Sequence, residues 1–177
     1  MTFWGKLIQY VGRIRYRDRY PSWLFEGDAR AHIAPVAHRW CIGRGIDFGA
    51  GRWPLVGAHP IDLDTDLQLE DVASGTQDFV FSSHALEHVR QWRATLCHFR
   101  RVLKPGGRLF LYLPHESMRL WNPESCWGRF AGHVWQPRLS TLLGWAILDN
   151  WRVCDYRAGP DRYYSWYIVL EKPCTYA

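Results

Sequence analysis

A glycine-rich turn and a pair of carboxylates lie close together in the first half of the chain. The run GIDFGAG occupies residues 45–51, and the run PIDLD brings Asp62 and Asp64, the first of them eleven residues after Gly51. Glycines let the backbone approach a ligand closely, and their amides can point at it. Carboxylates after a second strand accept hydrogen bonds from ribose hydroxyls. The two segments therefore indicate a site for a ligand that carries a ribose and a small charged group.

Two common nucleotide sites do not fit this spacing. A dinucleotide fingerprint needs G-x-G-x-x-G, a helix and an acidic residue about twenty positions further on. Here Arg52, Trp53 and Pro54 follow Gly51, and the short interval to Asp62 leaves no room for a full helix and strand. A P-loop is excluded as well, because no glycine turn is followed by Lys-Ser or Lys-Thr.

A third motif raises the question of a metal. The run HALEHV contains His84-x-x-Glu87-His88, the pattern of the inverzincin metallopeptidases. A zinc peptidase needs both imidazoles on one helical face, a third ligand, and a glutamate that activates water. No third ligand motif is recognisable, so we expect no metal. The alternative interpretation is that Leu86 and Val89 pack inward while Glu87 and His88 make supporting hydrogen bonds.

The elements that must position these residues alternate between strand and helix. Apolar runs predict strands around residues 45–50, 78–83, 108–114, 151–157 and 165–171, with a further short strand that ends at Asp62, and helical periodicity covers residues 26–40, 84–103 and 137–148. This order predicts an α/β fold with a mostly parallel sheet and helices on both faces. The last two strands are close in sequence, so we expect an antiparallel hairpin at the C-terminal edge.

Length and composition favour a single domain with a separate N-terminal segment. The chain has 177 residues and a net charge of +5, and its basic residues are nearly all Arg. Residues 1–23 form a predicted basic aromatic arm, and residues 24–177 form the domain. The arm, through residues 1–20, can contact a membrane surface or a protein partner, or it can pack its aromatics on the domain. Five scattered cysteines without a CxxC pair, and no signal peptide or transmembrane run, predict a cytoplasmic protein.

Four segments, in this order, resemble the class I S-adenosylmethionine-dependent methyltransferases, in particular their small bacterial members. The segments are GIDFGAG (45–51), PIDLD (60–64), DFVFSSHALEHV (78–89) and RVLKPGGRL (101–109), and GHVW at 132–135 adds to them. The resemblance implies a Rossmann-like fold, an enzyme and S-adenosyl-L-methionine as cofactor. The short link to Asp62 implies a shortened first helix and a frayed or missing third strand.

The resemblance also implies roles for individual residues. Asp47 is expected to hold the glycine turn or reach the methionine amino group through water. Asp62 is expected to bind the ribose hydroxyls, with Asp64 as a substitute. The remaining expected cofactor contacts are Gly49, Ala50, Gly51, Ser82 and Ser83.

Methyl transfer needs an in-line acceptor, exclusion of water and, for a hydroxyl acceptor, removal of a proton. The candidate bases are His84, His115 and His133, and Trp121, Trp127 and Trp135 can wall the acceptor pocket. We expect an oxygen acceptor on a small molecule or glycan, because the Asn/Asp-Pro-Pro-Tyr/Phe signature of base amino methylation is absent. Nucleic acid is the next acceptor class. A non-catalytic methyltransferase-like binding or partner subunit is the alternative from another class.

Overall fold

One six-stranded sheet carries the fold. The computed structural model describes residues 29–125, 128–129 and 131–174 of the chain. In the sheet, the strands follow the spatial order β2-β1-β3-β4-β6-β5. Their bounds are β1 (Gly45–Phe48), β2 (Ala58–Ile61), β3 (Gln77–Ser83), β4 (Leu103–Pro114), β5 (Arg152–Arg157) and β6 (Ser165–Glu171).

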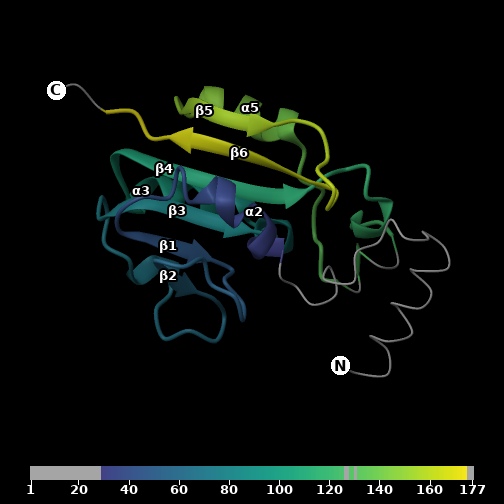
Figure 1. Cartoon of the computed structure of the whole chain (residues 1–177), viewed down its shortest axis with the longest axis horizontal. Coiled ribbons are helices and arrows are strands. Elements are labelled where there is room, and N and C mark those ends of the chain that lie inside the picture. The colour runs from purple at the N-terminus through teal and green to yellow at the C-terminus, as the bar shows by residue number, and fades with distance from the viewer. Residues whose placement is uncertain (1–28, 126–127, 130, 175–177) are drawn as a thin grey trace.

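The sheet is parallel from β2 to β4 and antiparallel beyond. β1 pairs in parallel with both β2 and β3, and β3 pairs in parallel with β4. β6 runs antiparallel to both β4 and β5, and β5 forms the edge. In Figure 1 the arrowheads of β1, β3 and β4 accordingly point toward one edge of the sheet, and β6 points the other way. The predicted mostly parallel sheet and its C-terminal antiparallel hairpin are confirmed.

Helices cover both faces of the sheet because β3 and its neighbours carry apolar side chains on each face. Val80 belongs to the core formed with α3 (Trp92–Val102) and α5 (Leu139–Leu148). Phe79 and Phe81, on the opposite face by the alternation of a strand, pack in the core beneath α2 (Ala29–Ala37). Figure 1 shows α2 in front of the sheet and α3 behind it. The prediction of helices on both faces is confirmed.

The link between β1 and β2 contains even less helix than predicted. The structure describes all of residues 49–57 and places no helix there. The segment from Asp62 to Thr76 likewise holds only one short 3-10 helix, η3 (Leu69–Asp71), and adds no strand to the sheet. The expected shortening of the first helix and loss of the third strand therefore both occur.

The helix predicted from His84 onward is wrong over its first part. Leu86–His88 form a single 3-10 turn, η4, and Val89 after it is extended. His84 has a φ of 51°, which lies in the left-handed region, and α3 begins only at Trp92. His84 and His88 therefore do not share a helical face, so the geometry that the peptidase pattern requires is missing.

Residues 1–28 lie outside the described part of the chain. The division into an arm at 1–23 and a domain at 24–177 therefore stays a prediction, as do the membrane or protein contacts of residues 1–20. None of the helices that the structure describes has the length and apolar character needed to cross a membrane.

Candidate cofactor and acceptor site

A cavity of about 420 Å³ opens where β1, β2 and β3 end. Its volume lies within the range of about 300–1,000 Å³ that is usual for small-molecule sites. Parallel strands place the side chains that follow them at one edge of a sheet, which is where ligands bind in such folds. The lining residues are Phe48, Gly49, Ile61, Asp62, Leu63, Gln68, His84, Ala85, His88 and Val89.

The glycine turn lines this cavity through Gly49. Gly49 has a φ of 75° and donates its N–H to the Ile61 carbonyl over 2.8 Å, which ties the turn to β2. A Cβ added at Gly49 would collide with the side chain of Ala85. Gly51 also has a positive φ, of 52°, but open space surrounds it. The turn is thus held close to the segment that follows β3, and glycine is required at Gly49 by contact as well as by conformation.

Asp62 is the acidic residue that faces the cavity. Its carboxylate accepts the Gly51 N–H over 2.6 Å and the Leu63 N–H over 2.7 Å. A carboxylate has about four lone-pair sites, so two remain for ribose hydroxyls. Leu63 lines the same cavity and is 97% exposed, an apolar surface that a bound ring would cover. Asp64 is exposed and does not line the cavity.

Asp47 holds the link that replaces the first helix. Its buried carboxylate accepts the Leu55 N–H over 2.7 Å. Burial raises the pKa of Asp47 to about 6, against the opposing effects of the Leu55 N–H and the Arg30 charge. The carboxylate therefore stabilises the turn, as one of its two expected roles requires, and Asp47 does not line the cavity.

His84 is one of the residues that line the cavity. Its Nδ1 lies 3.3 Å from Glu87 Oε1, and its Nε2 lies 2.9 Å from Ser165 Oγ. The ring also packs edge-on against Tyr112 and Trp121, with centroid distances of 5.2 and 5.3 Å. Two polar contacts and two aromatic contacts fix the orientation of this imidazole.

Glu87 is fully buried below the three imidazoles of His84, His88 and His133. Burial acts to raise the pKa of Glu87, but the close approach of His84 Nδ1, together with smaller effects of His88 and His133, outweighs burial, so the pKa of this carboxyl falls below its ordinary value. The buried group is therefore a carboxylate. Burial also lowers the pKa of His133, which keeps that imidazole neutral near pH 7, and His133 Nδ1 lies 2.8 Å from the Trp121 carbonyl.

Several predicted site residues are not brought to the cavity. His115 interacts with its own neighbours, Ser117 and Glu116. Ser82 and Ser83 carry buried hydroxyls without a hydrogen-bond partner, and His133 lies beside Glu87 instead of in the lining. Trp135 stacks on Trp92 at 4.5 Å and donates to the Leu86 carbonyl. The lining does not include Ala50, Gly51, Asp64, Ser82, Ser83, His115 or His133, and Trp127 lies outside the described residues.

The lining also holds residues that the sequence interpretation passed over. Gln68 lies in the polar segment before β3, where no motif marks it. Ala85 and Val89 belong to HALEHV; Val89 packs against the core, as predicted, and it also lines the cavity. His88 was assigned a supporting hydrogen bond, and it is in fact exposed and part of the lining.

The fold is that of the Rossmann-like methyltransferases. Residues 56–111 match a family described as a methyltransferase domain. Among curated proteins, a reducing polyketide synthase from Penicillium sp. is 34% identical over 131 residues, which is 64% of this chain. The chain spans only 5% of that synthase's length.

Solved structures share the fold. A 1,6-didemethyltoxoflavin-N1-methyltransferase from Burkholderia thailandensis, solved with its substrate and S-adenosylhomocysteine, matches with a TM-score of 0.62 at 13% identity, covering 93% of this chain and 85% of that one. The CurJ carbon methyltransferase matches with a TM-score of 0.52 at 14% identity, covering 74% of this chain and 48% of that one. These findings confirm the resemblance to class I methyltransferases, the enzyme class, and S-adenosylmethionine as the cofactor of that class.

Proposed function

We propose that this chain transfers a methyl group from S-adenosylmethionine to a hydroxyl oxygen of a small-molecule acceptor. The observation that carries the proposal is the shared cavity, which Gly49, Asp62 and His84 all line. The Asp62 carboxylate has oxygens that suit ribose hydroxyls. His84 has an oriented imidazole that suits proton removal. The methyltransferase neighbours support an acceptor of small size, and a glycan is the next candidate.

The residues of the cavity divide the work. S-adenosylmethionine supplies, when bound, a methyl group on a sulfonium sulfur, and an acceptor hydroxyl must lose its proton as it is methylated. Glu87 holds His84 through Nδ1, so Nε2 is the nitrogen that takes a proton. The acceptor hydroxyl replaces Ser165 as the partner of Nε2, since the Ser165 hydroxyl can donate to the Tyr163 carbonyl instead.

A carbon acceptor is the second candidate. It is favoured by the similarity to polyketide synthases and to a carbon methyltransferase. An activated carbon also has to lose a proton, so the same histidine would serve. The two candidates differ in the atom that carries the new methyl group, which makes the product the place to distinguish them.

The test is a methyl-transfer assay with [methyl-13C]-S-adenosylmethionine and a panel of hydroxyl, β-keto, glycan and nucleic-acid acceptors. Carbon NMR separates an O-methyl from a C-methyl product. We expect His84→Ala to lower kcat by about 10²–10⁴-fold with little change in KM. His115→Ala, outside the lining, should stay within about twofold of the wild type.

Calorimetry with S-adenosylhomocysteine separates the ways in which the proposal can fail. A well-folded wild type that does not bind it contradicts the enzyme. Binding without transfer to any acceptor favours the non-catalytic binding subunit. The cytoplasmic location expected from the cysteines stays a prediction.

A further inference from the structure

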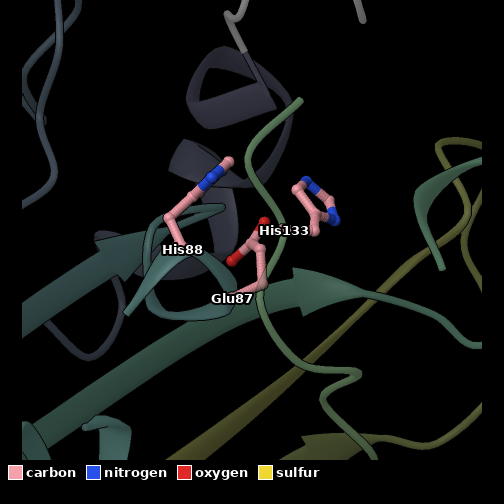
Figure 2. A group of neighbouring side chains, drawn as sticks. All are labelled: Glu87, His88 and His133. Carbon is pink, nitrogen blue, oxygen red and sulfur yellow. The ribbon is translucent and has the colours of Figure 1, made fainter. Parts of the chain in front are cut away.

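A cluster of possible metal ligands lies against the wall of the cavity. Glu87, His88 and His133 each offer one donor atom, and these atoms all lie within 4.8 Å of one another. Figure 2 shows the Glu87 carboxylate between the two imidazoles in that view, with Glu87 and His88 on the turn after β3 and His133 on a separate segment. The cluster therefore joins two parts of the chain that are distant in sequence.

Backbone hydrogen bonds fix these two parts relative to each other. The Val134 N–H donates to the Glu87 carbonyl over 3.0 Å. The Trp135 Nε1–H donates to the Leu86 carbonyl over 2.8 Å. Both bonds lie next to the three side chains in sequence, so the fold holds the segment of Glu87 and His88 against the segment of His133.

The Glu87 carboxylate has the features of an incomplete site. It is 0% exposed, and neither of its oxygens has a hydrogen-bond donor at good geometry. Its nearest ionic partner is His84 Nδ1, at 3.3 Å from Oε1. A buried carboxylate is costly unless it is paired and hydrogen-bonded. Oε2 is left for a cation that the described residues do not supply.

His133 is prepared in the way that metal-bound histidines are. Its Nδ1 lies 2.8 Å from the Trp121 carbonyl oxygen, which can only accept, so Nδ1 carries the proton. Nε2 is then the nitrogen with a free lone pair. Metal-bound histidines almost always donate their other N–H to a carbonyl, a carboxylate or water. His88 is exposed, lines the cavity and packs its ring edge-on against that of His133, with a centroid distance of 4.7 Å.

We propose that Glu87, His88 and His133 bind one divalent transition-metal ion, zinc in the first place, at the wall of the cavity. Two imidazoles and one carboxylate suit zinc, and three protein ligands leave an open position for water or another ligand. Zinc bonds of about 2.0–2.1 Å in a tetrahedron put donors about 3.4 Å apart, so the side chains close slightly around the ion. The set differs from the peptidase pattern, because His133 replaces His84 and no α-helix presents the ligands.

The direct test uses the full-length protein after treatment with a chelator and a check that it is still folded. Co²⁺ is titrated into this protein and its visible absorption is followed, and Zn²⁺ is then added as a competitor. We expect one ion per chain. Glu87→Gln and His133→Ala should weaken binding by more than about tenfold, since even supporting partners of a metal ligand are worth about 10–100-fold. His88→Ala should weaken binding as well, and its exposed position makes it the variant that keeps the fold. His38→Ala removes an exposed imidazole after α2 and is the matched control, with no expected change.

Three outcomes would overturn the site. The first is a folded wild type that does not hold about one ion per chain after dialysis. The second is a His38→Ala variant whose metal binding is weakened as much as that of the ligand variants. The third is full metal binding by both single variants, His88→Ala and His133→Ala. In the last case, lower thermal stability of Glu87→Gln without a metal effect identifies a structural carboxylate–imidazole cluster. Calorimetry of S-adenosylhomocysteine with the metal-free protein keeps this result separate from the proposed methyl transfer, because cofactor binding there does not depend on the ion.

Discussion

At the scale of single residues, Gly49 connects the cofactor turn to the segment that carries His84. In the sequence, the close approach of a ligand explains a glycine at this position, and the structure adds a second reason. Its backbone touches Ala85, the residue directly after His84, and no side chain fits between them. The close approach of the cofactor turn to the segment after β3 therefore requires a glycine at this position.

Gly49→Ala should destabilise the protein by more than about 2 kcal/mol. An alanine at φ of 75° costs on the order of 1–3 kcal/mol in strain, and the collision with Ala85 adds to it. Urea unfolding measures the loss. Adding Ala85→Gly should restore part of the stability, because it removes the collision and leaves the strain.

Gly51→Ala is the matched control for this prediction. Gly51 has a φ of 52° but no atom within 4 Å of an added Cβ, so only strain of about 1 kcal/mol is expected. Equal losses at Gly49 and Gly51, or no recovery with Ala85→Gly, would show that contact with Ala85 does not matter.

At the scale of elements, a single buried carboxylate stabilises the link between β1 and β2, which contains no helix. Asp47 at the end region of β1 holds Leu55, so the chain can pass from β1 to β2 without a helix between them. Keeping that carboxylate buried has an electrostatic cost, which appears as a pKa of about 6. Folding stability must then depend on pH in a defined direction.

Asp47 should make the protein lose stability as pH rises. The pKa in the folded state, about 6, is above the ordinary 3.8, so the folded state binds the proton more tightly. The contribution is complete below about pH 4 and is lost as pH rises through 6. A shift of this size corresponds to on the order of 2–3 kcal/mol between pH 4 and pH 8. Asp47→Asn keeps an acceptor for the Leu55 N–H and should remove that part of the slope, measured by urea unfolding across the range.

The pH prediction has a control in the same region. Asp64→Asn changes an exposed carboxylate and should give a curve parallel to the wild type. If Asp47→Asn also runs parallel, the carboxylate does not bind a proton preferentially in the folded state.

The elements show what the sequence can and cannot predict. Strands such as β3 are apolar runs, and their buried position follows from composition alone. The helix at HALEHV was wrong because Leu86 and Val89 have helical spacing and a true helix follows. The turn there exists because Val134 and Trp135, far along the chain, donate to the carbonyls of Glu87 and Leu86. Local spacing contains no information on those partners.

The same limit applies to the site. Gly49, Asp62 and His84 each follow a predicted strand of a parallel sheet. Because parallel strands end at the same edge, it can be predicted from the sequence that these three residues meet there. Gln68 and His133 come from irregular segments, and their positions depend on the hydrogen bonds that fold those segments. His115 follows a strand as His84 does, but its side chain contacts Ser117 in the turn after that strand and does not line the cavity.

At the scale of the whole molecule, the absence of a helix after β1 and of a third strand leaves the cavity bordered by turns. Leu63 and Gln68 close its outer side, and both are exposed. A ligand there would contact the ends of β1 and β2 and the segment after β3 at once. Ligand binding should therefore be visible as global stabilisation.

S-adenosylhomocysteine at about 100 times its Kd should stabilise the fold by about 2.7 kcal/mol. For a chain of this size, that corresponds to a rise in Tm of about 5–10 °C. Asp62→Ala removes the carboxylate that faces the cavity and should cost on the order of 1–3 kcal/mol in affinity, so the shift at the same ligand concentration should fall by about one third to nine tenths. Asp64→Ala, exposed and outside the lining, should keep the full shift. A loss confined to Asp64→Ala would move the ribose contact to the second carboxylate, and equal losses would mean that neither side chain binds the ligand directly.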